Sequence, residues 1–158
     1  MKTVFFDIDT QFDFMLPAGA LYVPGAERIL PAVARLNHAA TAVVSTTDAH
    51  AENDPEFRGW PPHCVAGAYG QVKPAATLLE RPVVVPNHPA PVDVTGARQT
   101  ILQKQSLDLF TNPNLQQVLD QLAADEYVVY GVVTEYCVKF AALGLLRSEE
   151  HTSELQSR

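Results

Sequence analysis

The sequence predicts a single α/β domain of 158 residues, built on a parallel β-sheet. Short apolar runs alternate with segments whose apolar residues recur at helical spacing. The clearest runs are residues 4–9 (VFFDID) and 127–133 (YVVYGVV), and such continuous apolarity is typical of strands that are covered on both faces. Polar residues able to do chemistry follow several of these runs. Because ligands of parallel sheets bind beyond the carboxyl ends of the strands, we expect the functional site there.

Each predicted element follows from a local pattern. Strands are expected at residues 4–9, 41–45, 83–85, 100–104 and 127–133, and helices near 29–36, after Asn112-Pro113-Asn114 over 115–122, and over 134–146. Residues 48–76 are rich in Pro, Gly, His and Asp and show no period. They predict a long loop, and long loops in compact domains are commonly functional.

Composition restricts the class of protein. Hydrophobic residues make up 47% of the chain, charged residues 18%, and the formal net charge is −7, which argues against binding nucleic acid or an anionic membrane through bulk charge. No apolar run approaches the roughly 20 residues of a membrane helix. No signal pattern precedes the first strand, so we expect a cytoplasmic protein. The sequence leaves a homo-oligomer open.

The last residues, 147–158 (RSEEHTSELQSR), stand apart from the rest of the chain. Eleven of them match the in-frame translation of a common short-read sequencing adapter. We therefore expect residues 1–146 to form the domain and 147–158 to be a non-native tail, and we exclude the tail from fold reasoning.

Three residues separated along the chain form a plausible nucleophilic centre. Cys137 follows a predicted strand in the first turn of a helix, where N–H groups and the helix dipole are expected to lower the thiol pKa. Asp9 ends the first strand and can take the thiol proton. Lys104 ends another strand and can keep Asp9 ionised. Cys64 lies in a Pro-rich loop without such a setting, and we expect it to be structural.

A second set of residues suits a divalent cation such as Zn, Fe or Mn. Asp48 and His50 follow the second predicted strand, and Glu56 and His63 lie further along the same loop. Carboxylate and imidazole donors in this mixture are ordinary ligands of these metals.

Three motifs resemble the isochorismatase-like cysteine hydrolases, and the nicotinamidases among them. They are DTQFDF from Asp9 to Phe14, WPPHCVAG from Trp60 to Gly67, and GVVTEYCV from Gly131 to Val138. The similarity extends in order to Leu146. It implies a three-layer α/β/α fold with a six-stranded parallel sheet, of which the final strands and their helix are missing from this chain.

The resemblance also implies roles for individual residues. Asp9, Lys104 and Cys137 would form the catalytic triad, and Asp48, His50 and His63 would ligate the metal, with Glu56 in the remaining position. The N–H groups of Val133 and Cys137 would form the oxyanion hole, with a cis peptide between Val132 and Val133. The ring pocket would be lined by Phe14, Trp60 and Tyr136.

The expected activity is hydrolysis of a small carboxamide, with nicotinamide as the leading substrate, through a thioester on Cys137. Another hydrolase of the same family, acting on a different amide, is the first alternative. The segment Phe5–Thr10 also resembles the opening of haloacid dehalogenase-type phosphatases, in which Asp7 would be the nucleophile. A non-catalytic module is the third alternative, because loss of the final strands would expose residues 127–133 as an aggregation-prone edge.

Overall fold

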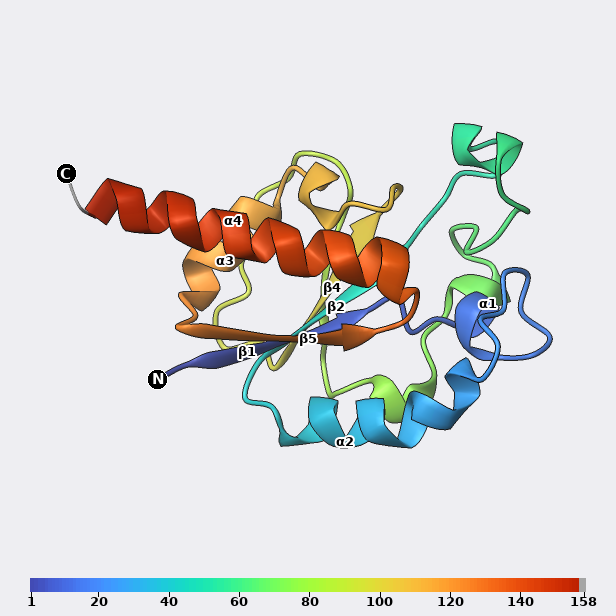
Figure 1. Ribbon diagram of the computed structural model, residues 1–158, viewed down its shortest axis with the longest axis horizontal. Coiled ribbons are helices and arrows are strands. Elements are labelled where there is room, and N and C mark those ends of the chain that lie inside the picture. Colours follow the sequence, from blue (N-terminus) through green and yellow to red (C-terminus); the bar gives the residue numbers. More distant parts are fainter. Residues whose placement is uncertain (157–158) are drawn as a thin grey trace.

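A computed structural model describes residues 1–156, with side chains to Ser148, and has the expected α/β architecture (Figure 1). The strands are β1 (Thr3–Ile8), β2 (Val43–Asp48), β3 (Val83–Val85), β4 (Gln99–Lys104) and β5 (Glu126–Gly131). The α-helices are α1 (Phe12–Met15), α2 (Leu30–Ala39), α3 (Leu115–Leu122) and α4 (Lys139–Gln156). A π-helical turn, η6 (Thr134–Val138), precedes α4, and short 3₁₀ turns include η2 (Pro55–Arg58).

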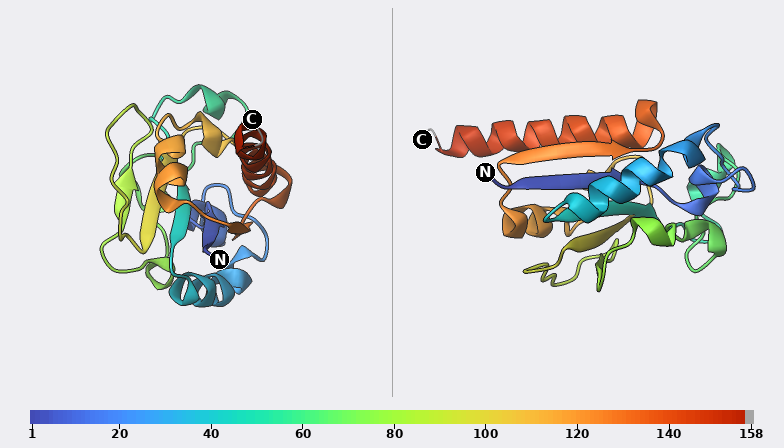
Figure 2. Two further views of the ribbon diagram at one scale, coloured as in Figure 1. Left: turned by 90° about the vertical axis from the view of Figure 1, so that its left-hand side faces the viewer. Right: turned by 90° about the horizontal axis from the view of Figure 1, so that it is seen from below.

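The described strands form one five-stranded sheet in the order β3-β4-β2-β1-β5, and every pairing in it is parallel. Helices α3 and α4 cover one face and α2 covers the other, which gives the three layers seen in Figures 1 and 2. The predicted fold class is therefore confirmed.

Strand β2 extends further than its sequence pattern suggested. We expected it to end at Ser45, but it continues through Thr46 and Thr47 to Asp48. All six of its residues are buried because β2 is the central strand and is paired on both sides. The β-branched threonines suit a strand, and their polar groups obscured the boundary in the sequence.

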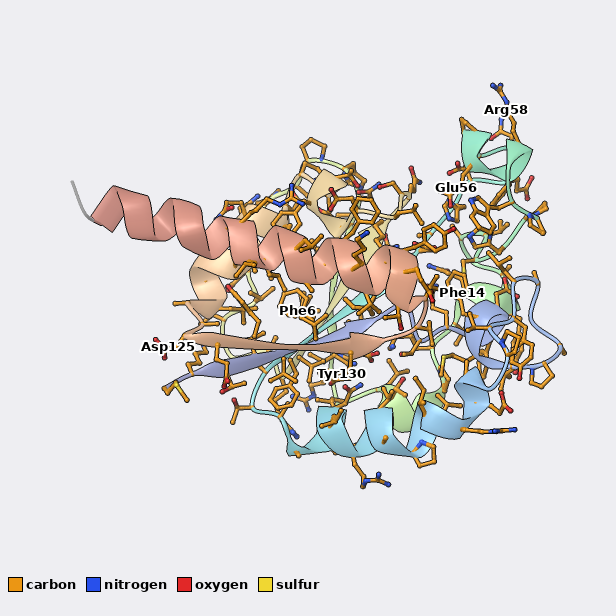
Figure 3. All side chains as sticks on the ribbon, in the orientation of Figure 1. Phe6, Phe14, Glu56, Arg58, Asp125 and Tyr130 are labelled. Atoms are coloured by element: carbon orange, nitrogen blue, oxygen red, sulfur yellow. The ribbon has the colours of Figure 1, made fainter. Side chains whose placement is uncertain are left out.

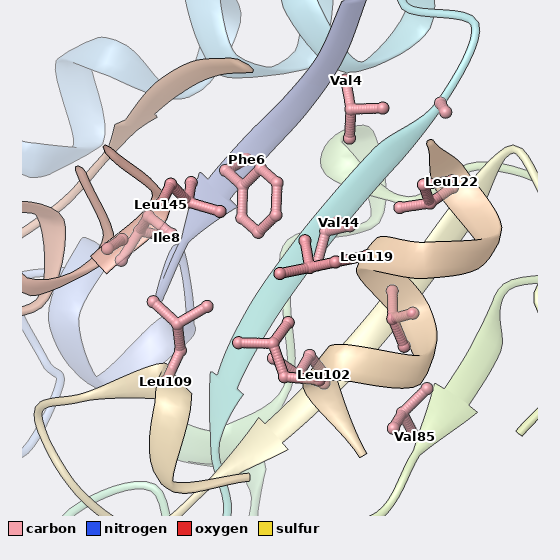
Figure 4. Packing of buried hydrophobic residues seen from close by; sticks show 14 of the residues in the cluster. Val4, Phe6, Ile8, Val44, Val85, Leu102, Leu109, Leu119, Leu122 and Leu145 are labelled. Carbon is pink, nitrogen blue, oxygen red and sulfur yellow. The ribbon is translucent and has the colours of Figure 1, made fainter. Parts of the chain in front are cut away.

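The main hydrophobic core lies between the sheet and the α3–α4 layer (Figure 4). Alternate residues of β1 enter it, namely Val4, Phe6 and Ile8, and they meet Leu119 of α3 and Leu145 of α4. The apolar spacing of α3, which also buries Leu115, Val118 and Leu122, explains why this segment is an amphipathic helix. A smaller cluster of Ala40, Val43 and Leu79 lies on the α2 face.

The C-terminal helix passes beyond the predicted domain boundary. Backbone residues 147–156 continue α4, while the expected tail's side chains from 149 onward, and residues 157–158 entirely, lie outside the described part. Because a polar segment of this composition is also compatible with a helix, the non-native origin of the tail stays a prediction. Within the described residues, no helix is long and apolar enough to cross a membrane.

Candidate active site

The carboxyl ends of β1, β2 and β4 bring three charged side chains to one buried point. Asp9 follows β1, Asp48 ends β2 and Lys104 ends β4, and all three are at most 4% exposed. Cys137, in η6 after β5, is also buried. Phe14 and Glu56 lie at this same end of the molecule in Figure 3.

Asp9 reaches this point through a turn in its own backbone. Alternation along β1 would send Asp9 to the same face as Phe5 and Asp7. Its φ of 53° lies in the left-handed region, and this rotation turns the side chain away from that course. Aspartate tolerates this region better than most residues. Thr46 of β2 then fixes the carboxylate, because its hydroxyl donates to Asp9 Oδ1 at 2.6 Å.

Lys104 links the acid to the thiol. Its Nζ lies 2.9 Å from Asp9 Oδ2, 2.5 Å from Asp48 Oδ1 and 3.7 Å from Cys137 Sγ. Burial by itself favours the neutral amine, but the carboxylates of Asp9 and Asp48 outweigh it and hold the pKa of Lys104 well above its usual value. Lys104 is therefore a fixed positive charge between the two acids.

The Cys137 thiol differs from the sequence expectation of a lowered pKa. Burial, and then the negative charge of Asp9, raise the pKa of Cys137, and Lys104 only partly offsets them. The helix-terminus argument gave the wrong sign because Cys137 is buried and faces an anion. The resting group is thus a neutral thiol, which needs a base to take its proton during attack.

Val133 carries the backbone irregularity that we expected as a cis peptide. No described peptide bond is cis, so that expectation is wrong, and Val133 instead has φ 61° and ψ 68°. A β-branched residue in this region is a genuine outlier. The left-handed residue lies between β5 and η6 and makes the turn into η6 without the cis bond that the resemblance implied.

Asp48, His50 and His63 converge as the sequence predicted for metal ligands. Asp48 Oδ2 lies 3.6 Å from His50 Nε2 and 3.8 Å from His63 Nε2. His50 Nδ1 is 3.0 Å from Asp54 Oδ2, and His63 Nδ1 is 2.8 Å from the Pro61 carbonyl. Since both acceptors require an Nδ1–H, it is the Nε2 atoms of the two rings that point toward Asp48. His50 Nε2 is buried without a hydrogen-bond partner among the described residues.

This donor set fits a divalent cation. One ligand atom from each of Asp48, His50 and His63 lies within 4.8 Å of the others, and second-ring N–H groups held by a carboxylate or carbonyl are typical of metal-binding histidines. Burial opposes a charged imidazole, but in the absence of a metal Asp48 and Asp54 outweigh it and raise the pKa of His50 to about 9. A bound cation would therefore have to displace the proton from His50 Nε2.

Asp54 is a residue that sequence reasoning missed. One of its oxygens holds His50, and the other accepts the Glu56 N–H at 2.9 Å and caps η2. Glu56 lies in a second metal-competent group with His50 and Asp54, rather than in the first group. The signal in the sequence was Asp54-Pro55, a helix-start pattern four residues after His50.

A pocket of about 210 Å³ lies beside Cys137, Asp48 and His63. All three aromatic residues that we expected in the ring pocket line it. Trp60 and Tyr136 meet edge to face at 5.9 Å, and Phe14 packs 5.5 Å from His63. The remaining lining residues are Leu21, Tyr22, Val23, Pro24, Asp48, Glu56, His63, Leu107, Val133 and Cys137. The segment 21–24 was missed because it has no motif of its own and reaches the pocket only through the fold.

The surroundings of Asp7 and Cys64 bear on two further predictions from the sequence, the phosphatase alternative and the structural role of Cys64. Asp7, the nucleophile of the phosphatase alternative, is fully buried and paired with Lys73 at 2.8 Å, so it is inaccessible to a phosphate ester. Cys64 is buried in a small cluster with Phe14, Met15 and Val132. Burial raises its pKa, which agrees with the structural role we expected.

Comparison with known proteins finds a consistent set of relatives. A family model described as the isochorismatase domain matches residues 3–151. A nicotinamidase of Acinetobacter baylyi is 24% identical over 160 residues, which cover 86% of this chain and 71% of that protein.

Solved structures agree with this similarity. The pyrazinamidase of Pyrococcus horikoshii in complex with zinc is 28% identical with a TM-score of 0.75, covering 93% of this chain and 79% of that one. A nicotinamidase/pyrazinamidase of Bacillus subtilis is 25% identical with a TM-score of 0.71, covering 90% and 78%.

Proposed function

Because this chain belongs to the isochorismatase domain family, we propose that it hydrolyses a small aromatic carboxamide, nicotinamide, to the carboxylic acid and ammonia. One observation carries the proposal: the Lys104 amine lies 2.9 Å from Asp9 and 3.7 Å from Cys137, and Cys137 lines the pocket. That arrangement couples a proton acceptor to a nucleophilic sulfur. The relatives named as a nicotinamidase and a pyrazinamidase support an aromatic carboxamide as the substrate.

In the first half-reaction, Asp9 accepts the Cys137 proton as sulfur attacks the amide carbonyl carbon. The S–C bond forms, and the tetrahedral oxyanion takes hydrogen bonds from the N–H groups of Val133 and Cys137. Asp9 returns its proton to the amide nitrogen, the C–N bond breaks and ammonia leaves. Lys104 stays protonated throughout and stabilises the negative charge that moves between Asp9 and sulfur.

In the second half-reaction, water replaces ammonia. Asp9 takes a proton from the water molecule, whose oxygen attacks the thioester carbonyl. The S–C bond breaks, the carboxylic acid departs and sulfur recovers the proton from Asp9. The same carboxylate therefore acts as base and acid in turn.

The walls of the pocket favour a substrate with a planar ring. Trp60, Tyr136 and Phe14 supply aromatic walls, which suit a planar heterocycle. Asp48, His50 and His63 would hold a divalent cation, and this cation would supply a Lewis-acidic contact for the ring nitrogen.

The experiment measures ammonia release from nicotinamide and from an aliphatic amide, each with and without prior removal of metal by a chelator. The proposal expects release from nicotinamide, little from the aliphatic amide, and loss of turnover with the chelator that zinc restores. Turnover of the aliphatic amide alone, unaffected by the chelator, would favour a different amidohydrolase of the same family.

A further inference from the structure

A second acid–amine pair is buried behind the active site and has no part in the proposed chemistry. Lys73 is 5% exposed and Asp7 is fully buried, and their charged atoms are 2.8 Å apart. Asp7 Oδ2 also accepts from Asn37 at 2.9 Å and from Ser45 at 3.2 Å. Removing two charges from water costs free energy that their attraction does not always recover, so a buried ion pair is weak evidence of a stabilising role. We therefore looked for a functional role of this pair.

Lys73 holds the residue next to the proposed base. Its Nζ hydrogen-bonds closely to the Thr10 hydroxyl and lies 3.5 Å from the Thr10 carbonyl. The Thr10 hydroxyl in turn donates to Asp7 Oδ1 at 2.7 Å. Thr10 is therefore fixed from two sides by groups of the ion pair.

The backbone held at Thr10 decides where Asp9 points. The left-handed φ of Asp9 turns its carboxylate toward Lys104, and this conformation is less favourable than the extended one that β1 would continue. On the other side of Thr10, Gln11 donates to the Asp48 and Gln71 carbonyls at 2.9 and 2.8 Å. The turn is thus anchored at both residues that follow Asp9.

We propose that Lys73 is a positioning residue for the base, acting through Thr10 to keep the Asp9 turn in its left-handed form. The inference rests on the proposed function, in which Asp9 moves the proton. The alternative is that Lys73 is only a counterion, which neutralises the buried carboxylate of Asp7 and has no effect on the Asp9 turn.

The test compares three variants with the metal-loaded parent protein. Lys73→Met removes the Thr10 contacts and leaves Asp7 uncompensated, whereas the double variant Asp7→Asn/Lys73→Met removes the contacts without leaving a buried charge. Tyr130→Phe is the matched control. It deletes the hydroxyl that donates to Asn37 at 2.5 Å, so it perturbs the outer part of the same network without touching Thr10.

Two measurements are made on each variant: kcat and KM for nicotinamide, and hydrogen–deuterium exchange of a peptide spanning residues 8–12. A positioning role predicts about a tenfold fall in kcat with little change in KM, and faster exchange of the peptide, in both Lys73 variants. Tyr130→Phe should change neither quantity.

A counterion role predicts that the double variant regains kcat and parental exchange, and that result would overturn the proposal. So would an unchanged kcat and exchange in Lys73→Met. If Lys73→Met fails to fold, Thr10→Val tests the same link without an unpaired charge. It should lower kcat as much as the double variant does, and combining the two should add nothing.

The exchange measurement also separates this inference from the proposed function. A parent protein that releases no ammonia from nicotinamide, but whose Lys73 variants exchange faster over residues 8–12, would defeat the function and keep the structural link. If the parent is active and the Lys73 variants have the same kcat and the same exchange as the parent, the proposed function stands and the role of Lys73 is refuted.

Discussion

Cys137 and Cys64 are both buried thiols with raised pKa values, yet only Cys137 lies against an amine. Lys104 is 3.7 Å from Cys137 Sγ, whereas Cys64 Sγ has the Gly70 carbonyl at 3.8 Å. The neighbours, rather than burial or thiol acidity alone, therefore distinguish the proposed nucleophile from a core residue.

Replacing each cysteine by alanine tests that distinction. Cys137→Ala should lower kcat by about 10⁴-fold or more, because the residual rate would come from binding and the oxyanion site alone. Cys64→Ala should keep kcat within a few-fold and lose only some stability. Steady-state ammonia release with a thermal melt measures both, and equal activity losses in the two variants would contradict the assignment.

Asp54 should control the metal affinity through His50. Asp54→Ala removes the carboxylate that holds His50 Nδ1 at 3.0 Å and caps η2 before Glu56. Loss of such a partner typically weakens binding by 10–100-fold. Competition with a chromophoric chelator for zinc measures this dissociation constant.

Asp93 provides a matched control for this prediction. Its carboxylate makes the same contact to the N–H two residues on, Thr95, at 2.9 Å, but it lies outside the site. Asp93→Ala should leave the zinc affinity unchanged, and an equal weakening in both variants would show that Asp54 has no specific role.

At the level of elements, the sequence predicted those parts of the site in which a charged residue stands at the end of a strand. Asp9, Asp48 and Lys104 were expected to lie together because the carboxyl ends of parallel strands share one edge, and their charged groups are in contact. The turn that redirects Asp9, the left-handed Val133 and the capping Asp54 were missed. Their positions depend on φ values and long-range hydrogen bonds, which a linear pattern does not encode.

The junction of β1 with the end of β5 depends on Gly131. Its φ is 138°, and a Cβ there would collide with the backbone of Ile8, whose carbonyl accepts from Val132 N at 3.0 Å. Gly131→Ala should therefore destabilise the fold by about 3 kcal/mol or more, from backbone conformation and overlap together.

Gly96→Ala is the control for conformation alone. Gly96 has φ 75° with nothing within 4 Å of an added Cβ, so the substitution should cost only about 1 kcal/mol. Urea unfolding of both variants measures the difference in the free energy of unfolding. Equal losses would mean that the close approach of β5 to β1 is unimportant.

For the whole molecule, composition and periodicity were enough to predict an α/β fold with a parallel sheet. Short apolar runs alternate with segments of helical spacing, and polar residues follow several of these runs. They were insufficient for strand limits, as β2 showed, since threonines in a doubly paired strand resemble a loop in sequence. The origin of residues 147–158 likewise remains a prediction, which resequencing of the source locus would test.

The two edges of the sheet differ in length and predict where copies of the chain associate. Strand β5 has six residues and β3 has three, and among the described residues each pairs on one side only. Long edges rich in apolar residues invite pairing with another strand, and a lysine on the edge opposes it. Val128→Lys should therefore reduce self-association in sedimentation velocity more than Val84→Lys on β3.

Equal behaviour of the two lysine variants, or a parent protein that is monomeric at all concentrations, would count against association through β5. Because neither valine lines the pocket, ammonia release from nicotinamide should be retained in both variants and serves as the check that the fold is intact.

The proposed reaction transfers an acyl group from the amide nitrogen to one sulfur atom, that of Cys137. The metal-loaded protein is mixed with nicotinamide, quenched in acid and digested, and the peptides are analysed by mass spectrometry. The account predicts a nicotinoyl group on the Cys137 peptide, absent from the Cys64 peptide and from Cys137→Ala. Ammonia release without any acyl group on Cys137, at turnover rates equal to those of the alanine variant, would contradict it.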